Sequence, residues 1–155
     1  MTSVEVRAHT ALHVLKGAVS KVLGAKWTAG VWVRENRGRL TVQLERKPSP
    51  EELAKVEEEA NRKIEENAPV EELEMSRAEA EDRWGDAIYD LFPLPASITT
   101  LKILHIPGWN VNACKAAHTG TTGEIGSLRI VKTRYRPSKK LLELSFEIPQ
   151  NVGGA

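Results

Sequence analysis

Two pairs of metal-binding residue types occur in this chain with the same spacing. The segment "HTALH" places His9 and His13 four positions apart, and "CKAAH" places the single cysteine, Cys114, four positions before His118. Residues at i and i+4 of a helix lie on one face, and zinc accepts nitrogen and sulfur ligands in a tetrahedral arrangement. The two pairs together therefore predict one zinc site with these four residues as ligands.

The composition of this ligand set favours a catalytic over a structural zinc ion. Structural sites are usually closed and rich in cysteine, whereas catalytic sites keep a position for water. Four simultaneous ligands would leave no such position in a tetrahedron, so one of them must be held loosely or the coordination must expand. The alternative is that the histidines are ordinary helix residues and the cysteine is an inert core residue. His105 has no partner four positions away and is interpreted as structural.

The residues around His9 and His13 predict an amphipathic helix over positions 6–23. Its apolar stripe at helical spacing consists of Leu12, Leu15, Val19 and Val22. Gly24 is a typical residue at a helix end. The two histidines lie beside the stripe, so we expect them at the edge of the core and not in open solvent.

The rest of the chain contains both strand and helix signals. A capping box of Ser49 and Glu52, with Pro50 between them, starts a second helix, and Ser76 with Glu79 starts a short third helix. Strands are predicted at 31–33, 40–46, 98–106, 128–136 and 140–148. We therefore expect one α+β domain spanning residues 1–155, in which antiparallel strands and hairpins pack with helices, ending in a frayed tail, "NVGGA".

The composition excludes several classes of protein. Of the 155 residues 41% are hydrophobic, but no apolar run approaches the ~18 residues of a membrane helix. The first ten residues, "MTSVEVRAHT", lack the basic start and the apolar run of a secretory signal. A single cysteine cannot form an internal disulfide, so we expect a cytoplasmic protein. We also expect no membrane contact, and the sequence makes no obligate protein partner evident.

Charge is distributed unevenly although the net charge is only +1. Positions 51–86 contain 14 of the 21 acidic residues and 5 of the 22 basic residues, whereas positions 127–140 contain six basic residues and no acidic one. Such a basic segment can bind RNA phosphates, but it is also compatible with an ordinary solvent-exposed surface. The predicted RNA-binding residues are Arg129, Lys132, Arg134 and Arg136.

Three motifs in this order resemble the editing domain of alanyl-tRNA synthetases, and above all the free-standing archaeal AlaX proteins in their short form. The family motifs are HTATH, CGGTH and TGEIG, found here in related form at 9–13, 114–118 and 122–126. The resemblance spans essentially the whole chain and implies the fold of the alanyl- and threonyl-tRNA synthetase editing domains. One departure is "KAA" at 115–117, where the family has glycines that allow close backbone approach to a ligand.

The resemblance implies ATP-independent trans-editing, in which a Zn²⁺-dependent hydrolase cleaves the ester that joins serine, and in some cases glycine, to alanine tRNA. Thr28 occupies the position where serine-preferring forms have a threonine facing the substrate, and Gly123 and Gly126 match the glycines of TGEIG. Thr28 and Glu124 are thus the predicted catalytic residues, although a loop glutamate is more often a structural hydrogen-bond partner. The predicted partner is mischarged seryl- or glycyl-tRNA for alanine.

Two alternatives remain compatible with the residues. One is a non-catalytic RNA-binding module with a structural zinc ion, and the other is a metal-dependent hydrolase of small esters. Hydrolysis of seryl-tRNA separates the deacylase from the binding module, and activity on simple esters without activity on tRNA indicates the esterase.

Overall fold

The computed structural model describes residues 3–151, which form helices and two antiparallel sheets. This arrangement confirms the predicted α+β fold class. The helices are α1 (Val4–Leu23), α2 (Pro50–Glu65) and α3 (Arg77–Trp84), with the 3-10 turns η1 (Gly85–Ile88) and η2 (Thr122–Ile125). The large sheet has the order β1–β2–β7–β6 and contains β1 (Thr28–Arg34), β2 (Arg37–Gln43), β6 (Arg129–Arg136) and β7 (Leu141–Glu147). The small sheet has the order β3–β4–β5 and contains β3 (Glu71–Ser76), β4 (Thr100–Ile106) and β5 (Asn110–Ala113).

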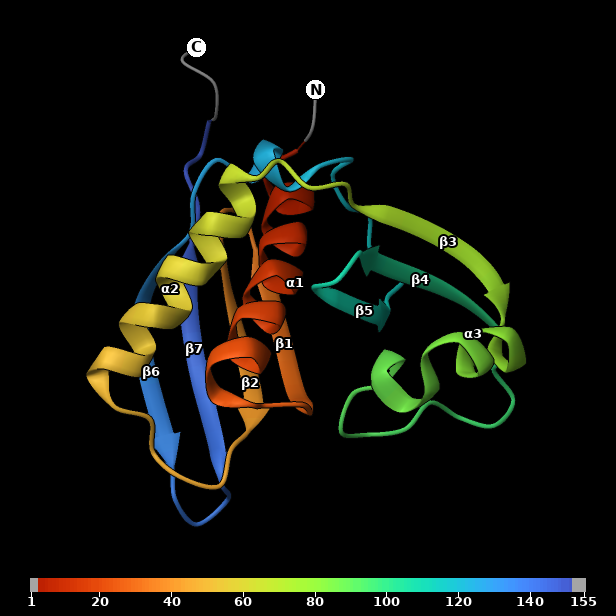
Figure 1. Cartoon of the computed structure of the whole chain (residues 1–155), viewed down its shortest axis with the longest axis horizontal. Helices are drawn as coiled ribbons and strands as arrows, with labels where there is room; N and C mark the ends of the chain where they lie inside the picture. Colours follow the sequence, from red (N-terminus) through yellow and green to blue (C-terminus); the bar gives the residue numbers. More distant parts are fainter. Residues whose placement is uncertain (1–2, 152–155) are drawn as a thin grey trace.

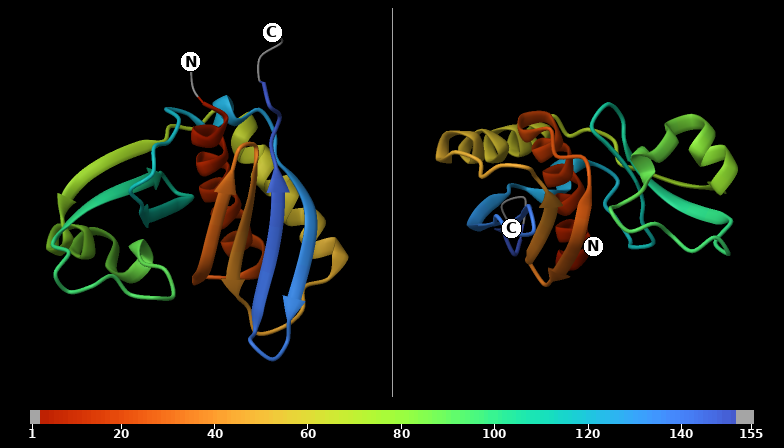
Figure 2. Two further views of the ribbon diagram at one scale, coloured as in Figure 1. Left: turned by 180° about the vertical axis from the view of Figure 1, so that it is seen from behind. Right: turned by 90° about the horizontal axis from the view of Figure 1, so that it is seen from below.

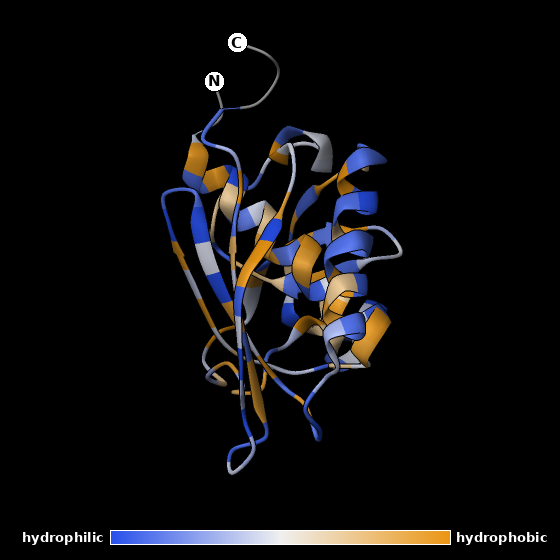
Figure 3. Cartoon of the chain, turned by 90° about the vertical axis from the view of Figure 1, so that its left-hand side faces the viewer, coloured by the Kyte–Doolittle hydropathy of each residue, from blue (hydrophilic) through white to orange (hydrophobic). Residues whose placement is uncertain are grey.

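The main body is a two-layer sandwich of α1 and α2 on one face of the large sheet (Figure 1). Buried and less buried residues alternate along β7, so that Leu142, Leu144 and Phe146 point into the core with Leu40 of β2 and Leu15 of α1. Figure 3 shows the same alternation of hydrophobic and hydrophilic residues along the strands. No helix covers the opposite face of the large sheet in the described part of the chain, as the view from behind in Figure 2 shows.

Local capping signals set the end of α1 and the start of α2 as predicted, whereas α1 begins at Val4, two residues before the predicted start. Gly24 adopts the left-handed conformation (φ 71°) directly after α1, and its N–H donates to the carbonyl of Ser20. The Ser49 hydroxyl accepts from the N–H of Glu52 while the Glu52 carboxylate accepts from the N–H of Ser49, which confirms the predicted capping box. The Ser76 hydroxyl accepts from the N–H of Glu79 and so caps α3, which is one of the two bonds of the predicted capping box.

A smaller lobe projects from the main body between α2 and η2. It contains the small sheet, α3 and η1, and its own apolar cluster includes Ala80, Ile88 and Ile103. The two chain segments that connect the lobe to the body lie side by side, since the Val70 N–H donates to the Gly120 carbonyl at 2.9 Å. Helix α1 lies between the large sheet and the small one, so one side of it faces the smaller lobe (Figures 1 and 2).

Two expectations of the sequence concern the chain's surroundings and its end. Among residues 3–151, no helix combines the length and the apolar character needed to cross a membrane. The tail predicted at "NVGGA" lies outside the described residues except for Asn151.

Candidate metal centre

Three side chains that favour metal binding converge between α1 and the smaller lobe. His13 lies on the side of α1 that faces this lobe, Cys114 follows β5 directly, and His118 comes four residues later. One donor atom from each residue lies within 4.8 Å of the others, and this is a spacing that can hold a metal ion. His13 is only 1% exposed and the His118 side chain is completely buried. The site is therefore formed by elements far apart in the sequence.

Hydrogen bonds fix both imidazoles so that their Nε2 atoms are available. The Nδ1 atom of His13 lies 3.0 Å from the Oδ1 atom of Asn110, and the Nδ1 atom of His118 lies 3.0 Å from the Oε2 atom of Glu72. Because both partners are acceptors, Nδ1 carries the proton in each ring and Nε2 has a lone pair. The Nε2 atom of His118 lies 3.5 Å from the sulfur of Cys114.

One of these Nε2 atoms has no partner within the described chain. The His13 Nε2 atom is buried and makes no hydrogen bond to any residue between 3 and 151, and the same holds for the Nδ1 atom of His9. A buried polar atom without a partner is costly, so such an atom calls for an explanation. A lone pair directed at a thiol and a second imidazole is the arrangement that a bound cation would satisfy.

Burial controls the protonation of this group. It lowers the pKa of His13 well below its ordinary value, and the nearby Lys16 charge acts in the same direction. Burial also lowers the pKa of His118, against the opposing effect of Glu72. Both histidines are therefore neutral at pH 7, as metal ligands must be. Burial raises the pKa of Cys114, so this thiol ionises readily only beside a cation.

His9 lies one helical turn before His13, but it is outside the three-residue group. Its ring centroid is 6.4 Å from that of His118, whereas the His13 and His118 centroids are 5.0 Å apart. The structure thus brings three of the four predicted ligands together and places the fourth beside them. Its role as a ligand remains a prediction.

A small cleft of about 150 Å³ opens next to this group. Thr28 at the start of β1 lines it and is 3% exposed, and Asn110, which holds His13, lines it as well. Lys16 and Trp109 contribute further walls. Thr28, the threonine predicted to contact the substrate, therefore shares a cleft with Asn110, which holds His13, although His13 itself is not among the residues that line the cleft.

The "TGEIG" element forms the turn η2, which packs on both helices of the body. The Oε2 atom of Glu124 accepts from the N–H groups of Gly120 at 2.9 Å and Thr121 at 3.1 Å. The Gly123 N–H donates to Asn67, whose Oδ1 atom would lie 2.2 Å from a Cβ at position 123. Gly126 has a φ of 91°, which favours glycine. These contacts explain the glycines by the shape of the turn and give Glu124 a capping role.

The four basic residues of β6 predicted to bind RNA share the uncovered face of the large sheet. Arg129, Lys132, Arg134 and Arg136 are paired with alternate residues of β7 that point away from the core. Lys132, Arg134 and Arg136 line a shallow depression together with Arg39 of β2. Arg136 and Arg39 both approach Glu143, with N–O distances of 2.9 and 4.0 Å. The basic segment thus forms one exposed surface with β2.

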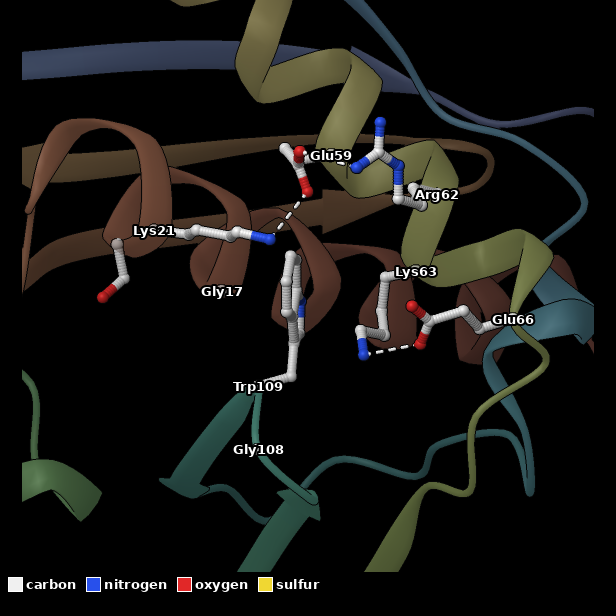
Figure 4. A pocket seen from close by; sticks show the side chains of 9 residues that line it. Gly17, Lys21, Glu59, Arg62, Lys63, Glu66, Gly108 and Trp109 are labelled. Carbon is white, nitrogen blue, oxygen red and sulfur yellow. Dashed lines mark hydrogen bonds and ion pairs between the residues drawn. The ribbon is translucent and has the colours of Figure 1, made fainter.

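A second pocket, of about 410 Å³, lies between α1, α2 and the turn before β5 (Figure 4). The Trp109 indole packs over Gly17 and donates from Nε1 to the Val14 carbonyl at 2.9 Å. The ammonium groups of Lys21 and Lys63 lie 5.7 and 4.8 Å from its ring centroid. Lys21 is paired with Glu59 and Lys63 with Glu66, so both ammonium groups already have partners within the pocket (Figure 4).

Three residues that surround the site, Glu72, Asn110 and Lys16, are not predicted by the sequence. Glu72 lies in an acidic segment that has the composition of exposed surface, and Asn110 lies in a four-residue strand. The spacing of Asn110 to Cys114 is a usable signal, because residues four apart along an extended segment point to the same side of it. The structural interpretation of His105 agrees with its contacts, since its Nδ1 atom lies 2.7 Å from Glu71 and its ring packs on Trp84.

The fold and the site together define an α+β domain with a buried His–Cys–His group of metal-binding type. Comparison with known proteins shows that the sequence of this chain is similar to part of several alanine–tRNA ligases. The ligase of Methanopyrus kandleri is 40% identical to this chain over 126 residues, and those of Methanococcus aeolicus and Ignicoccus hospitalis are 38% identical over 129 and 130 residues. No protein-family model matches the chain.

The chain is therefore homologous to a segment of the alanyl-tRNA synthetases. The aligned residues make up 81–83% of this chain, but only 14% of the length of each of these relatives. This homology confirms the resemblance to alanyl-tRNA synthetases that the three motifs indicated.

Proposed function

We propose that this protein is a zinc-dependent aminoacyl-tRNA deacylase of the short AlaX type, which removes serine from mischarged alanine tRNA. The observation that carries the proposal is the convergence of His13, Cys114 and His118 within 4.8 Å, on a chain homologous to alanyl-tRNA synthetases. The metal-binding group and the homology are both needed for this proposal. A metal site alone does not define a substrate, and homology to part of a long enzyme alone does not define an activity.

The residues fit a zinc ion. The donor set is two neutral imidazoles and one thiol, and the buried Nε2 atom of His13 has no partner among residues 3–151. His13, Cys114 and His118 would hold the ion, with His9 beside them as a fourth, more weakly held ligand. Zinc in such a site supplies a Lewis acid for an ester carbonyl, or lowers the pKa of a water molecule toward about 7.

The chain's own residues support the reaction in several ways. Asn110 and Glu72 fix the two imidazole tautomers through their Nδ1 atoms, so the site needs little rearrangement. Thr28 borders the cleft, and in this scheme its hydroxyl forms a hydrogen bond with the hydroxyl of a serine side chain. In this scheme Gly123 and Gly126 shape the turn that supports the N-terminal part of α1, where the Arg7 guanidinium donates to the carbonyls of Glu124 and Ile125.

Serine recognition by Thr28 suits the discrimination that editing requires. Serine differs from alanine by one hydroxyl group, so a pocket that is simply larger cannot reject alanine strongly. A pocket that hydrogen-bonds the hydroxyl can do so, because alanine leaves its polar group unpaired. Glycine also lacks the hydroxyl, so activity on glycyl-tRNA would need a different basis.

The RNA part of the substrate is assigned to the uncovered face of the large sheet. Basic residues of β6 and Arg39 of β2 lie on this face, and their charge attracts phosphates without reading sequence. Because the only cysteine would serve as a metal ligand in the thiolate form, a reducing cytoplasm suits the activity.

A deacylation assay on purified seryl-, glycyl- and alanyl-tRNA for alanine tests the proposal. We expect rapid release of serine, little release of alanine, and loss of activity after chelation that zinc restores. Zinc binding without any deacylation would indicate an RNA-binding module with a structural ion. Cleavage of small esters in the absence of activity on tRNA would indicate an esterase.

A further inference from the structure

A charged network lies between the cleft and the histidine–cysteine group. The Lys16 ammonium donates to the Oδ1 atom of Asp90 at 3.0 Å and to the Oδ1 atom of Asn112 at 2.6 Å. The Asn112 side-chain N–H₂ in turn donates to the same Asp90 oxygen at 3.2 Å and to the Ile88 carbonyl at 3.0 Å. Three elements, α1, β5 and the loop after η1, thereby fix the orientation of one carboxylate.

The network uses only one of the two Asp90 oxygens. Both donors reach Oδ1, whereas Oδ2 has no hydrogen-bond partner among the residues that the structure describes. The Lys16 side chain is 9% exposed, whereas the Asp90 side chain is 40% exposed. The carboxylate therefore extends from its buried partner toward solvent. The Lys16 and Asp90 charges thus balance each other at the boundary between the protein interior and solvent.

The position of Asp90 relates it to the proposed substrate contacts. Its neighbour Leu91 donates its N–H to the Thr28 carbonyl at 2.8 Å. Lys16 and Thr28 both line the cleft. Asn112 precedes Cys114 by two residues, and Lys16 follows His13 by three, which is about one helical turn. The residue after Asp90 is therefore bonded to the Thr28 backbone, and the two side chains that hold the Asp90 carboxylate lie close in sequence to His13 and Cys114.

We propose that Asp90 is the binding site for the α-ammonium group of an aminoacyl ester, with Lys16 and Asn112 as its positioning residues. The inference rests on the proposed function and adds the recognition of a substrate group to it. An aminoacyl ester carries a primary ammonium next to the scissile carbonyl, and a peptidyl or N-acylated ester does not. A fixed carboxylate at this place selects for the ammonium by a charge-assisted hydrogen bond.

Other charged groups at the cleft do not offer such a site. The cleft is lined by the cations Lys16 and Lys26, and Lys26 is paired with Asp86 at 2.9 Å. Asp86 has a 62% exposed side chain and lacks the buried donors that orient Asp90. Asp86→Asn is therefore a matched control, since it removes one acidic charge near the same cleft.

The test compares seryl-tRNA with N-acetylseryl-tRNA for the wild type, Asp90→Asn and Asp86→Asn. Asparagine keeps an acceptor for Lys16 but loses the charge. We expect the wild type and Asp86→Asn to prefer the free amine, and Asp90→Asn to lose on the order of 10- to 100-fold in kcat/KM on seryl-tRNA only, so that the preference disappears. An equal loss on both substrates, or no loss on either, would overturn the proposal.

A binding measurement separates this inference from the proposed function. If the wild type hydrolyses neither ester, the deacylase proposal fails, and calorimetry with a seryl amide of 3′-amino-3′-deoxyadenosine still tests the ammonium site. Tighter binding of the free amine than of its N-acetyl derivative, with the difference lost in Asp90→Asn, supports the site. Equal binding of the two compounds by the wild type overturns it.

Discussion

At the scale of single residues, two hydrogen bonds decide what the histidines can do. Glu72 and Asn110 each occupy an Nδ1 atom, and this leaves the Nε2 atoms of His118 and His13 for a metal ion. We expect Glu72→Gln to lower zinc affinity by roughly 10- to 100-fold, because the amide orients His118 less strongly and no longer increases its basicity. Competition with a chromophoric chelator measures the affinity.

Glu74→Gln is the control for this prediction, because Glu74 lies two residues further along the same strand and is paired with Lys102 of β4. It should leave the affinity unchanged. If Glu72→Gln binds zinc as tightly as the wild type, the contact of Glu72 with His118 serves only to hold β3 against the segment that contains His118.

Thr28→Val tests how the side chain of the substrate is recognised. Valine keeps the branched shape at a position that is 3% exposed, and it removes the hydroxyl group. Under the proposed function, hydrolysis of seryl-tRNA should slow by a factor of about 10 or more, as expected when one hydrogen bond of roughly 1–3 kcal/mol is removed. Release of alanine from alanyl-tRNA, measured in the same assay, should change much less. Equal slowing of both reactions would assign Thr28 a supporting role only.

At the scale of secondary structure, the contact between α1 and the turn before β5 requires a glycine, which has no side chain, at position 17. A Cβ at position 17 would lie 2.2 Å from the Nε1 atom of Trp109. Gly17→Ala gains about 1 kcal/mol of helix propensity, but displacing a packed indole costs roughly 1–3 kcal/mol, so we expect a net loss of stability. Urea unfolding followed by tryptophan fluorescence measures both the stability and the altered environment of Trp109.

Gly30→Ala provides the comparison, since no atom lies within 4 Å of a Cβ placed there. It should unfold close to the wild-type midpoint. If Gly17→Ala were as stable as wild type with unchanged fluorescence, the packing of Trp109 on α1 would be wrong.

The elements that the sequence predicts correctly are those with local signals. The helix ends follow from Ser49, Glu52 and Gly24, and the hairpins of the large sheet follow from the alternation of apolar residues. Strand β3 escaped prediction because "EELEMS" is acidic and lacks β-branched residues, and it is a strand only because it pairs with β4. The motif spacing identified the three residues that converge, His13, Cys114 and His118, whereas Glu72 reaches His118 only through that non-local pairing.

At the scale of the whole molecule, charge separates into an acidic segment and a basic sheet face. Replacing Arg134 and Arg136 with glutamine should weaken tRNA binding and reduce the slope of log K against log salt by about one unit for each phosphate that is no longer bound. Lys55→Gln with Arg62→Gln removes the same charge from α2, which covers the opposite face of the sheet, and should leave the slope nearly unchanged. Binding titrations at several salt concentrations measure this slope. Equal slopes for both double variants would place the RNA elsewhere.

The strand order of the large sheet also determines when it can be completed during synthesis. Strand β7 lies between β2 and β6 and follows both of them in the sequence. The hairpin of β1 and β2 therefore leaves the ribosome with an unpaired edge, and β6 has no neighbour until residues 141–147 appear. Pairing across such a large separation in sequence is slow, so the edge of β2 that binds β7 stays unpaired until residues 141–147 have been made. A chain truncated before residue 141 would thus lack the strand that joins the β1–β2 hairpin to β6.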